Sequence, residues 1–262
     1  MSNRNNFLHL AVIENRPNEV KRLLSPPELR SDLNPEGLTP LQLARLLGRK
    51  KCESFLHVIS ERKILVQKKG ASKCSPISPH EFTDLFEAPY FDWLRFRSYQ
   101  TLQLVSKSCP YILRIPKIEN RQLAEVYANE LRQGFIAPCS IRWIDDQMHY
   151  GLVAEKDFEE GEWLGEYTGV VREYLRTRPD QNPYCLHYPT RCWSFRYFMI
   201  DAYLGGNETR FINHGDDPNL SPLCLARGNF LHTVFFTSKA IKKGEQLTFD
   251  YGKDFWRHRE KR

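Results

Sequence analysis

The chain has 262 residues, of which 41% are hydrophobic and 13% aromatic, and its formal net charge at pH 7 is +6. This length fits one large domain or two ordinary ones, and the apolar content is sufficient for a sizeable core, which excludes a disordered polar protein. The longest apolar stretches are far too short to span a bilayer and no signal peptide is visible, so we expect no membrane helix and no membrane partner.

The seven cysteines are widely spaced and form no C-x-x-C pair. Neither a disulfide framework nor a zinc module is therefore indicated, and a reducing compartment is the better expectation. Charge is unevenly placed: residues 1–135 contain 21 Lys and Arg against 14 Asp and Glu, whereas residues 136–262 contain 17 against 18. The basic first half would suit an acidic partner, and the sequence leaves open whether it contacts nucleic acid.

Residues 1–60 contain an internal repeat. The tetrapeptide LHLA at 8–11 returns as LQLA at 41–44, an offset of 33 residues, which is the period of ankyrin repeats. In the second copy Thr39 is a helix cap and Pro40 occupies the first helical position. The segment resembles one and a half to two ankyrin units, and an unrelated helical hairpin is the alternative. Because so few units bury little surface, we expect them to pack on the rest of the chain, and a protein partner on this segment is a second possibility.

Two further segments precede the β-rich part of the chain. Residues 61–80 are rich in Lys, Ser, Gly and Pro and indicate a linker or extended connection. Residues 81–135 turn helical again, with an aromatic stretch FTDLFEAPYFDWLRF and apolar residues at near-helical spacing in IENRQLAEVYANELRQGF. We expect packing helices there and assign them no chemistry.

From residue 136 onward the sequence consists of short β-type runs separated by turns. The runs are SIRWI (140–144), YGLVA (150–154), EWLGEYTGVV (162–171), RYFMIDA (196–202), HTVFFTS (232–238) and QLTFDYG (246–252). Six or more short strands without alternating long helices predict a compact, mainly β domain and exclude a Rossmann sheet. The fold class expected for the whole chain is α+β.

Three segments of this β region gain meaning when they are considered together: EYTG (166–169), RFINHGDDPN (210–219) and KGEQLTFDYG (243–252). Each alone fits an ordinary turn or strand end. In this order and spacing, with GLVAEKDFEEGEWLGEYTGVV (151–171), they resemble the SET-domain protein lysine methyltransferases over about residues 140–252. The resemblance implies a SET catalytic domain at 136–252, built from small sheets with a pseudoknot, and a helical pre-SET region at 81–135.

The resemblance also implies the cofactor S-adenosylmethionine and a set of site residues. It assigns Tyr251 and Tyr167 to catalysis, because a phenol can orient the target amine without itself titrating. The cofactor-binding residues that it implies are Tyr150, Gly151, Arg210, Phe211, Asn213, His214 and Trp256. The substrate channel would be lined by Tyr167, Tyr251, Phe255 and Trp256, whose aromatic surface favours a neutral lysine and tolerates its methylammonium product.

No general base stands out. The motif places His214 on the cofactor, so we expect the lysine proton to leave to water. The remaining histidines of this half that we considered, His187, His232 and His258, have no partner motif and are expected to be surface or strand residues.

The chain departs from the family pattern at two places. The family's usual Asn-His-Ser-Cys is here Asn213-His214-Gly215-Asp216, and the tail GKDFWRHREKR has no cysteine. We therefore expect no metal and a zinc-free closing segment at 253–262, in which Phe255 and Trp256 either cover the lysine channel or only anchor the C-terminus. The usual Gly-x-Gly of the cofactor turn is His149-Tyr150-Gly151, which loses one glycine's backbone freedom.

The segment 172–195 falls where the family carries its variable insert. Tyr184, Tyr188 and Trp193 are its candidates for substrate contact, and ordinary packing is the alternative. Acidic clusters such as Asp145-Asp146 would attract a lysine-rich segment such as a histone tail, or would simply be solvated.

The sequence therefore predicts a protein (histone) lysine N-methyltransferase. With its repeat segment, the chain is similar to ankyrin-plus-SET proteins of intracellular bacteria, so it is expected in the cytoplasm or, as a secreted effector acting on chromatin, in a host nucleus. The alternative is a catalytically weak or inactive SET and ankyrin interaction module. A third hypothesis, a nucleic-acid-binding helical domain with a structural β half, lacks a recognised motif.

Overall fold

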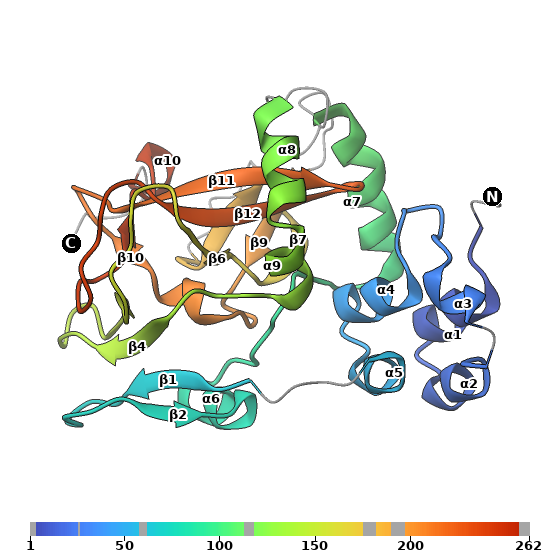
Figure 1. The fold of residues 1–262 in the computed structure, drawn as a ribbon, viewed down its shortest axis with the longest axis horizontal. Helices are drawn as coiled ribbons and strands as arrows, with labels where there is room; N and C mark the ends of the chain where they lie inside the picture. The colour runs from blue at the N-terminus through green and yellow to red at the C-terminus, as the bar shows by residue number, and fades with distance from the viewer. Residues whose placement is uncertain are drawn as a thin grey trace.

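The computed structural model of the chain has a mixed α+β architecture, with helices in the first half and short strands in the second (Figure 1). None of the helices within the described ranges is both long and apolar enough to cross a bilayer. The structure describes residues 4–25, 27–57, 62–112, 118–174, 182–189 and 197–256.

Five short helices gather at the N-terminal end of the molecule (Figure 1). They form two helical hairpins, α1–α2 and α4–α5, with α3 between them. Each helix of the second hairpin begins 33 residues after its counterpart in the first, the offset of the sequence repeat. The five helices are α1 (Phe7–Ile13), α2 (Pro17–Arg22), α3 (Glu28–Ser31), α4 (Pro40–Leu46) and α5 (Lys50–Leu56).

The first helix of each hairpin begins with a capping box. The Asn6 side chain accepts from the His9 backbone and Thr39 from that of Gln42, while the side chain three residues on bonds back to the cap. His9 is fully buried, and its Nε2 donates to the Leu38 carbonyl oxygen at 2.9 Å. This bond joins the two helical hairpins, because Leu38 lies just before the second one.

Acid should destabilise the contact between the two helical hairpins that His9 makes with Leu38. Burial lowers the pKa of His9, whereas an unfolded histidine titrates near 6.5. Below about pH 6.5 the unfolded chain binds a proton that the folded chain refuses, so the free energy of unfolding falls as pH is lowered from 7 to 5. Urea denaturation at three pH values should show a shallower fall for His9→Gln than for wild type. The exposed His80→Gln is the control and should keep the wild-type slope; equal slopes for all three proteins would contradict the assignment.

The expected linker at 61–80 is wrong for most of its length. Its described residues contain a β-hairpin, β1–β2, whose inner face buries Ile64, Val66 and Ile77. Alternation of buried and exposed side chains explains the strand, and the Lys- and Ser-rich composition is concentrated in the turn. The hairpin extends a four-stranded sheet of order β2-β1-β4-β5 in which β1 and β4 are parallel. These strands are β1 (Ile64–Gln67), β2 (Ser75–Ile77), β4 (Cys139–Trp143) and β5 (Tyr150–Ala154).

The region between the hairpin and β4 is helical, as the pattern predicts. Val126 is an exception within its apolar set, because its side chain is 70% exposed while Leu131 is buried. Helix α8 packs on β11. The elements are α6 (Pro79–Phe86), β3 (Arg95–Phe96), α7 (Tyr99–Ile112), α8 (Ile118–Val126) and α9 (Ala128–Gln133).

Three further small sheets complete the β-rich part, with orders β3-β7-β9-β8, β11-β12-β6 and β10-β13. Every predicted run overlaps a strand. Four strands of these sheets, β3, β8, β10 and β11, were not predicted. The elements are β6 (Trp163–Glu166), β7 (Val170–Tyr174), β8 (Cys185–Tyr188), β9 (Tyr197–Asp201), the 3₁₀ turn η1 (Glu208–Phe211), β10 (Asn213–His214), β11 (Leu220–Arg227), β12 (Phe230–Thr237), β13 (Thr248–Phe249) and α10 (Lys253–Trp256).

One continuous core joins the helical hairpins to the sheets. Leu8 and Leu43 of the hairpins belong to the same buried cluster as Ile141 and Phe235 of the β-rich part. Full burial of one such side chain contributes about 1.5–3 kcal/mol. The repeat segment therefore packs on the rest of the chain, as its short length requires.

Candidate active site

A cleft of about 1490 Å³ lies where β5, η1, β10, β13 and α10 meet. Eight of the ten predicted site residues line it: Tyr150, Tyr167, Arg210, Phe211, Asn213, Tyr251, Phe255 and Trp256. The other two, Gly151 and His214, are not among the lining residues but lie next to them, Gly151 beside Asn213 and the His214 ring 4.9 Å from that of Trp256. Segments more than 100 residues apart in sequence thus converge on one cavity.

A parallel pair of two-residue strands fixes the Asn-His motif. Asn213 of β10 lies opposite Thr248 of β13, and His214 opposite Phe249. The Asn213 side-chain amide donates to the Tyr150 carbonyl oxygen at 3.2 Å. The motif is therefore tied both to β13 and to the first residue of β5.

His214 packs inside this pair and supports Tyr251. Its Nδ1 accepts from the Tyr251 backbone N–H at 3.3 Å, which leaves Nε2 as the protonated nitrogen of a neutral ring. Nε2 is buried without a hydrogen-bond partner in the described structure, since Asp216 Oδ1 approaches it to 3.4 Å but is poorly aligned. The ring thus has a donor to offer a bound ligand.

The turn before β5 has a histidine in a backbone conformation that favours glycine. His149 has φ of 59°, the left-handed conformation that glycine adopts most easily. At Gly151 an added Cβ would lie 2.7 Å from Gln246 Nε2 and 3.1 Å from Asn213 Nδ2. A side chain at position 151 would therefore force neighbouring side chains to move, and glycine fits without such a shift.

The hydroxyl protons of Tyr251 and Tyr167 are both held by the main chain. Tyr251 donates to the Ile212 carbonyl oxygen at 2.9 Å, and Tyr167 to that of Tyr184 at 2.8 Å. Burial raises the pKa of both phenols well above the usual range. Each phenol is therefore neutral near pH 7, with oxygen lone pairs left to accept a hydrogen bond in the cleft.

Arg210 supplies the positive charge of the site. Its guanidinium lies 4.7 Å from the centroid of the Tyr184 ring and 5.4 Å from that of Phe211. Its Nε and Nη1 are buried and have no hydrogen-bond partner among the described residues, and burial lowers its pKa. A buried guanidinium with unused donors facing a cleft is suited to binding a carboxylate.

The last described helix forms one wall of the cleft. In α10 the Phe255 ring packs edge-on against Tyr251 at 4.6 Å between centroids. The Trp256 ring lies 4.9 Å from that of His214, and its Nε1 is buried without a hydrogen-bond partner in the described ranges. No group of three or more His, Cys, Asp or Glu side chains within these ranges is arranged to hold a metal ion.

Of the aromatic residues in segment 172–195 that were predicted to contact substrate, one lines the cleft and another is a core residue. Tyr184 lines the cleft. Tyr188 does not, because it is fully buried and its hydroxyl oxygen accepts from the Leu231 N–H, so its predicted substrate contact is wrong and it is a core residue. Trp193 and His258 lie outside the described residues.

Two of the isolated histidines are strand residues, as expected: His187 lies on β8 and His232 on β12. His232 also has a structural partner, because its Nδ1 lies 2.7 Å from Glu166 Oε1, a carboxylate that is almost fully buried. The two residues come from neighbouring strands, so their pairing follows from sheet order and has no local sequence signal.

Ten further residues and Phe86 also line the cleft, and most of them lie outside the three motif segments. Phe86 of α6 is the clearest case: its ring lies 4.6 Å from that of Phe211 and 5.1 Å from that of Tyr150. Its only sequence signal is the aromatic stretch in which it lies. The other residues are Glu87, Trp143, Gln147, Met148, His149, Pro183, Cys185, Leu186, Ile212 and Phe249.

Comparison with known proteins finds a family model and relatives that are similar to this part of the chain. Residues 149–252 match the family model described as the SET domain. The histone-lysine N-methyltransferase EZH2 of Chaetomium thermophilum is 35% identical over 114 residues, which are 40% of this chain and 8% of that protein. The human histone-lysine N-methyltransferase EHMT1 is 32% identical over 114 residues, covering 42% of this chain and 9% of its own length. This chain thus matches less than a tenth of either relative.

A solved structure supports the same fold over a longer stretch. The structure of ATXR5 in complex with a mono-methylated histone matches with a TM-score of 0.53 at 18% sequence identity. The match covers 66% of this chain and 84% of that one. The shared fold therefore extends beyond the 149–252 segment.

Proposed function

We propose that the SET domain at residues 149–252 makes this chain an S-adenosylmethionine-dependent protein lysine N-methyltransferase, with histone lysines as its substrates. The observation that carries the proposal is one cleft in which the phenols of Tyr251 and Tyr167 and the buried Arg210 meet. The names of the relatives, histone-lysine N-methyltransferases, support the substrate class.

The residues present fit the cofactor. Arg210 and His214 hold unused buried donors, and Trp256 Nε1 is a third. Arg210 would hold the amino acid carboxylate, and Asn213, His214 and the Tyr150-Gly151 turn would hold the remainder of the ligand, with Phe211 and Trp256 as apolar walls. S-adenosylmethionine supplies a methyl group on a sulfonium, which is strongly activated for displacement by an amine.

The chain contributes positioning and a dry environment. The Tyr251 and Tyr167 oxygens, with their protons held by carbonyl groups, accept hydrogen bonds from a lysine amine and so fix its orientation. Burial among aromatic rings favours the neutral amine and tolerates a methylammonium. Neither phenol titrates near pH 7, so neither is the base, and the lysine proton is lost to water.

Phe255 and Trp256 are assigned to cover the lysine channel. Their packing on Tyr251 and His214 supports this covering role. The knot-like threading implied by the family resemblance is supported by the β10–β13 pair, which places Asn213 beside the strand that leads to Tyr251.

The N-terminal helical hairpins are assigned here as ankyrin-like units. Their 33-residue spacing supports this assignment, and their common core with the sheets supports a packing role. A protein partner on the same segment is a further part of the proposal. The combination of such units with a SET domain underlies the further proposal of a bacterial effector that modifies host chromatin.

Transfer of labelled methyl groups to core histones tests the proposed function. The wild-type chain with labelled S-adenosylmethionine should label histones at lysine, as read by mass spectrometry. Histones whose lysines have been chemically acetylated are the matched control and should remain unlabelled. A wild-type chain that labels neither preparation would overturn the proposal and favour an inactive interaction module.

A further inference from the structure

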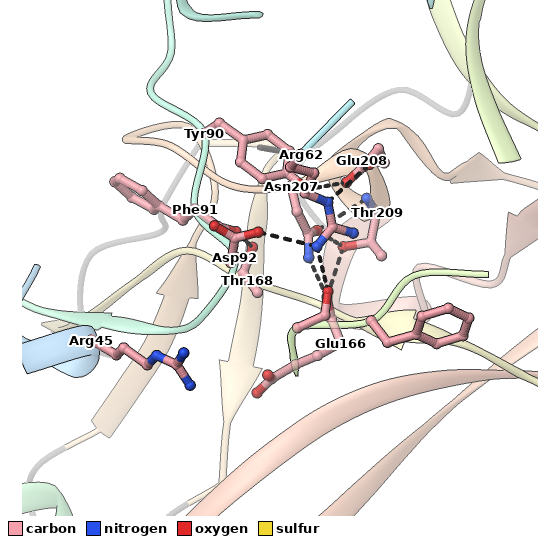
Figure 2. Close-up of polar contacts among 12 residues, drawn as sticks. Arg45, Arg62, Tyr90, Phe91, Asp92, Glu166, Thr168, Asn207, Glu208 and Thr209 are labelled. Carbon is pink, nitrogen blue, oxygen red and sulfur yellow. Dashed lines mark hydrogen bonds and ion pairs between the residues drawn. The ribbon is translucent and has the colours of Figure 1, made fainter. Parts of the chain in front are cut away.

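A buried polar cluster lies outside the EYTG, RFINHGDDPN and KGEQLTFDYG segments and contacts the turn η1, which leads into the cleft. Its members are Arg62, Tyr90 and Asp92 from the segment ahead of the SET domain and Glu208 from η1 (Figure 2). The first three are outside the stretch that matches the SET model. The mechanism above uses none of these side chains.

Arg62 and Tyr90 hold the Glu208 carboxylate from two sides. The Tyr90 hydroxyl donates to Glu208 Oε2 at 2.6 Å, and Arg62 Nε lies 3.8 Å from Oε1. Arg62 Nη1 also donates to Asp92 Oδ1 at 3.1 Å and to the Gly134 carbonyl oxygen at 2.6 Å. Arg62 therefore joins three separate segments of the chain at the start of η1.

The opposite side of η1 is held by the end of β6. The Asn207 side-chain amide donates to the Glu166 carbonyl oxygen at 2.9 Å, and the Thr209 hydroxyl lies 3.3 Å from the same oxygen (Figure 2). Glu166 directly precedes Tyr167. The turn is thus fixed between the catalytic tyrosine's strand and the Arg62 cluster.

Such external support matters because η1 is short. A 3₁₀ turn of four residues has few hydrogen bonds of its own, so outside contacts determine its placement. Arg210 and Phe211 end this turn and line the cleft, and Asn213 follows two residues later. A shift of Glu208 would therefore move the Arg210 guanidinium and the Asn213-His214 pair together.

We infer that Arg62, Tyr90 and Glu208 are positioning residues that set the cofactor-binding affinity of the cleft through η1. This inference rests on the proposed function. The cluster is held by charge as well as by geometry: burial disfavours the guanidinium, but the Glu208 and Asp92 carboxylates outweigh it and raise the pKa of Arg62. Removing one partner leaves a buried charge unpaired, whereas removing both charges does not.

Steady-state kinetics separates positioning from simple structural support. Arg62→Met should raise the KM for S-adenosylmethionine about 10-fold and leave kcat at saturating cofactor and the KM for histone within about 2-fold. Tyr90→Phe, a milder change that keeps the ring, should raise the KM for the cofactor about 3-fold. The double variant Arg62→Met/Glu208→Gln should recover most of the single variant's loss, because the buried Glu208 charge is removed together with its partner, and the Asp92 carboxylate that remains is partly exposed to water. Lys242→Met, which breaks the exposed ion pair with Asp157, is the control and should change nothing.

Hydrogen exchange of the free chain gives a second result that needs no cofactor. Arg62→Met should speed amide exchange at residues 208–214 and leave residues 230–237 of β12 at the wild-type rate. Uniformly faster exchange, or an unchanged cofactor KM in both Arg62→Met and Tyr90→Phe, would overturn the inference. A wild-type chain that does not bind the cofactor refutes the proposed function, and wild-type exchange at 208–214 in the variant refutes the positioning role, so the two failures can be told apart.

Discussion

Tyr251→Phe should lower kcat about 100-fold while leaving the KM for S-adenosylmethionine within about 2-fold. The variant keeps the ring that packs on Phe249 and Phe255 but loses the oxygen that faces the cleft. Without it, the lysine amine has one hydrogen-bond acceptor fewer to hold its orientation. The loss therefore falls on the chemical step, which single-turnover transfer at saturating cofactor measures directly.

The products of Tyr251→Phe carry further information. One hydroxyl fewer leaves room for a water molecule or a bulkier amine, so the residual product should be shifted toward higher methylation, which intact-mass measurement would show. Tyr127→Phe is the matched control, because this ring stacks on Trp163 in the smaller core cluster at 5.0 Å and does not line the cleft. Equal turnover by Tyr251→Phe and wild type would remove the role assigned to the hydroxyl.

Arg210→Met should weaken cofactor binding about 100-fold without loss of stability. Two charge-assisted hydrogen bonds to a carboxylate contribute about 1.5–3 kcal/mol each, and neither would form with methionine. The free chain loses little, because Arg210 Nε and Nη1 have no hydrogen-bond partner in the described structure and a buried unpaired charge is costly. We expect the free energy of unfolding to be unchanged or higher, as measured by urea denaturation.

Arg95 offers a control of the same kind. It is also buried, its Nε also lacks a hydrogen-bond partner in the described structure, and burial lowers its pKa. It does not line the cleft. Arg95→Met should therefore leave the KM for the cofactor at the wild-type value. A wild-type KM for Arg210→Met, or equal losses in both variants, would contradict the carboxylate-binding role of Arg210.

Local patterns predicted several strands of the β-rich part. The runs YGLVA and RYFMIDA contain β5 and β9, and HTVFFTS overlaps β12, because apolar residues at short spacing are bounded by clear turn residues. The strand β11 escaped, since Pro222 and polar residues interrupt its pattern and it is stabilised by its long pairing with β12. The β1–β2 hairpin escaped because its sheet partner β4 lies over 70 residues away.

The candidate site was predictable where its motifs are contiguous. Asn213, His214 and Tyr251 lie within two short sequence segments; Asn213 and Tyr251 line one cleft, and the His214 ring lies 5.5 Å from that of Tyr251. Phe86 and the Arg62 cluster were not predictable, since their contacts depend on how the segment ahead of the SET domain packs against η1. Tyr188 looked like a substrate contact for the same reason: aromatic composition does not distinguish a core ring from a cleft ring.

Calorimetric titration of S-adenosylmethionine into the whole wild-type chain is the most direct test, because every assigned role depends on this cleft holding the cofactor. We expect saturable binding of one molecule per chain, weakened about 100-fold by Arg210→Met and unaffected by Arg95→Met. Absence of binding at millimolar cofactor, or binding that Arg210→Met leaves unchanged, would contradict it.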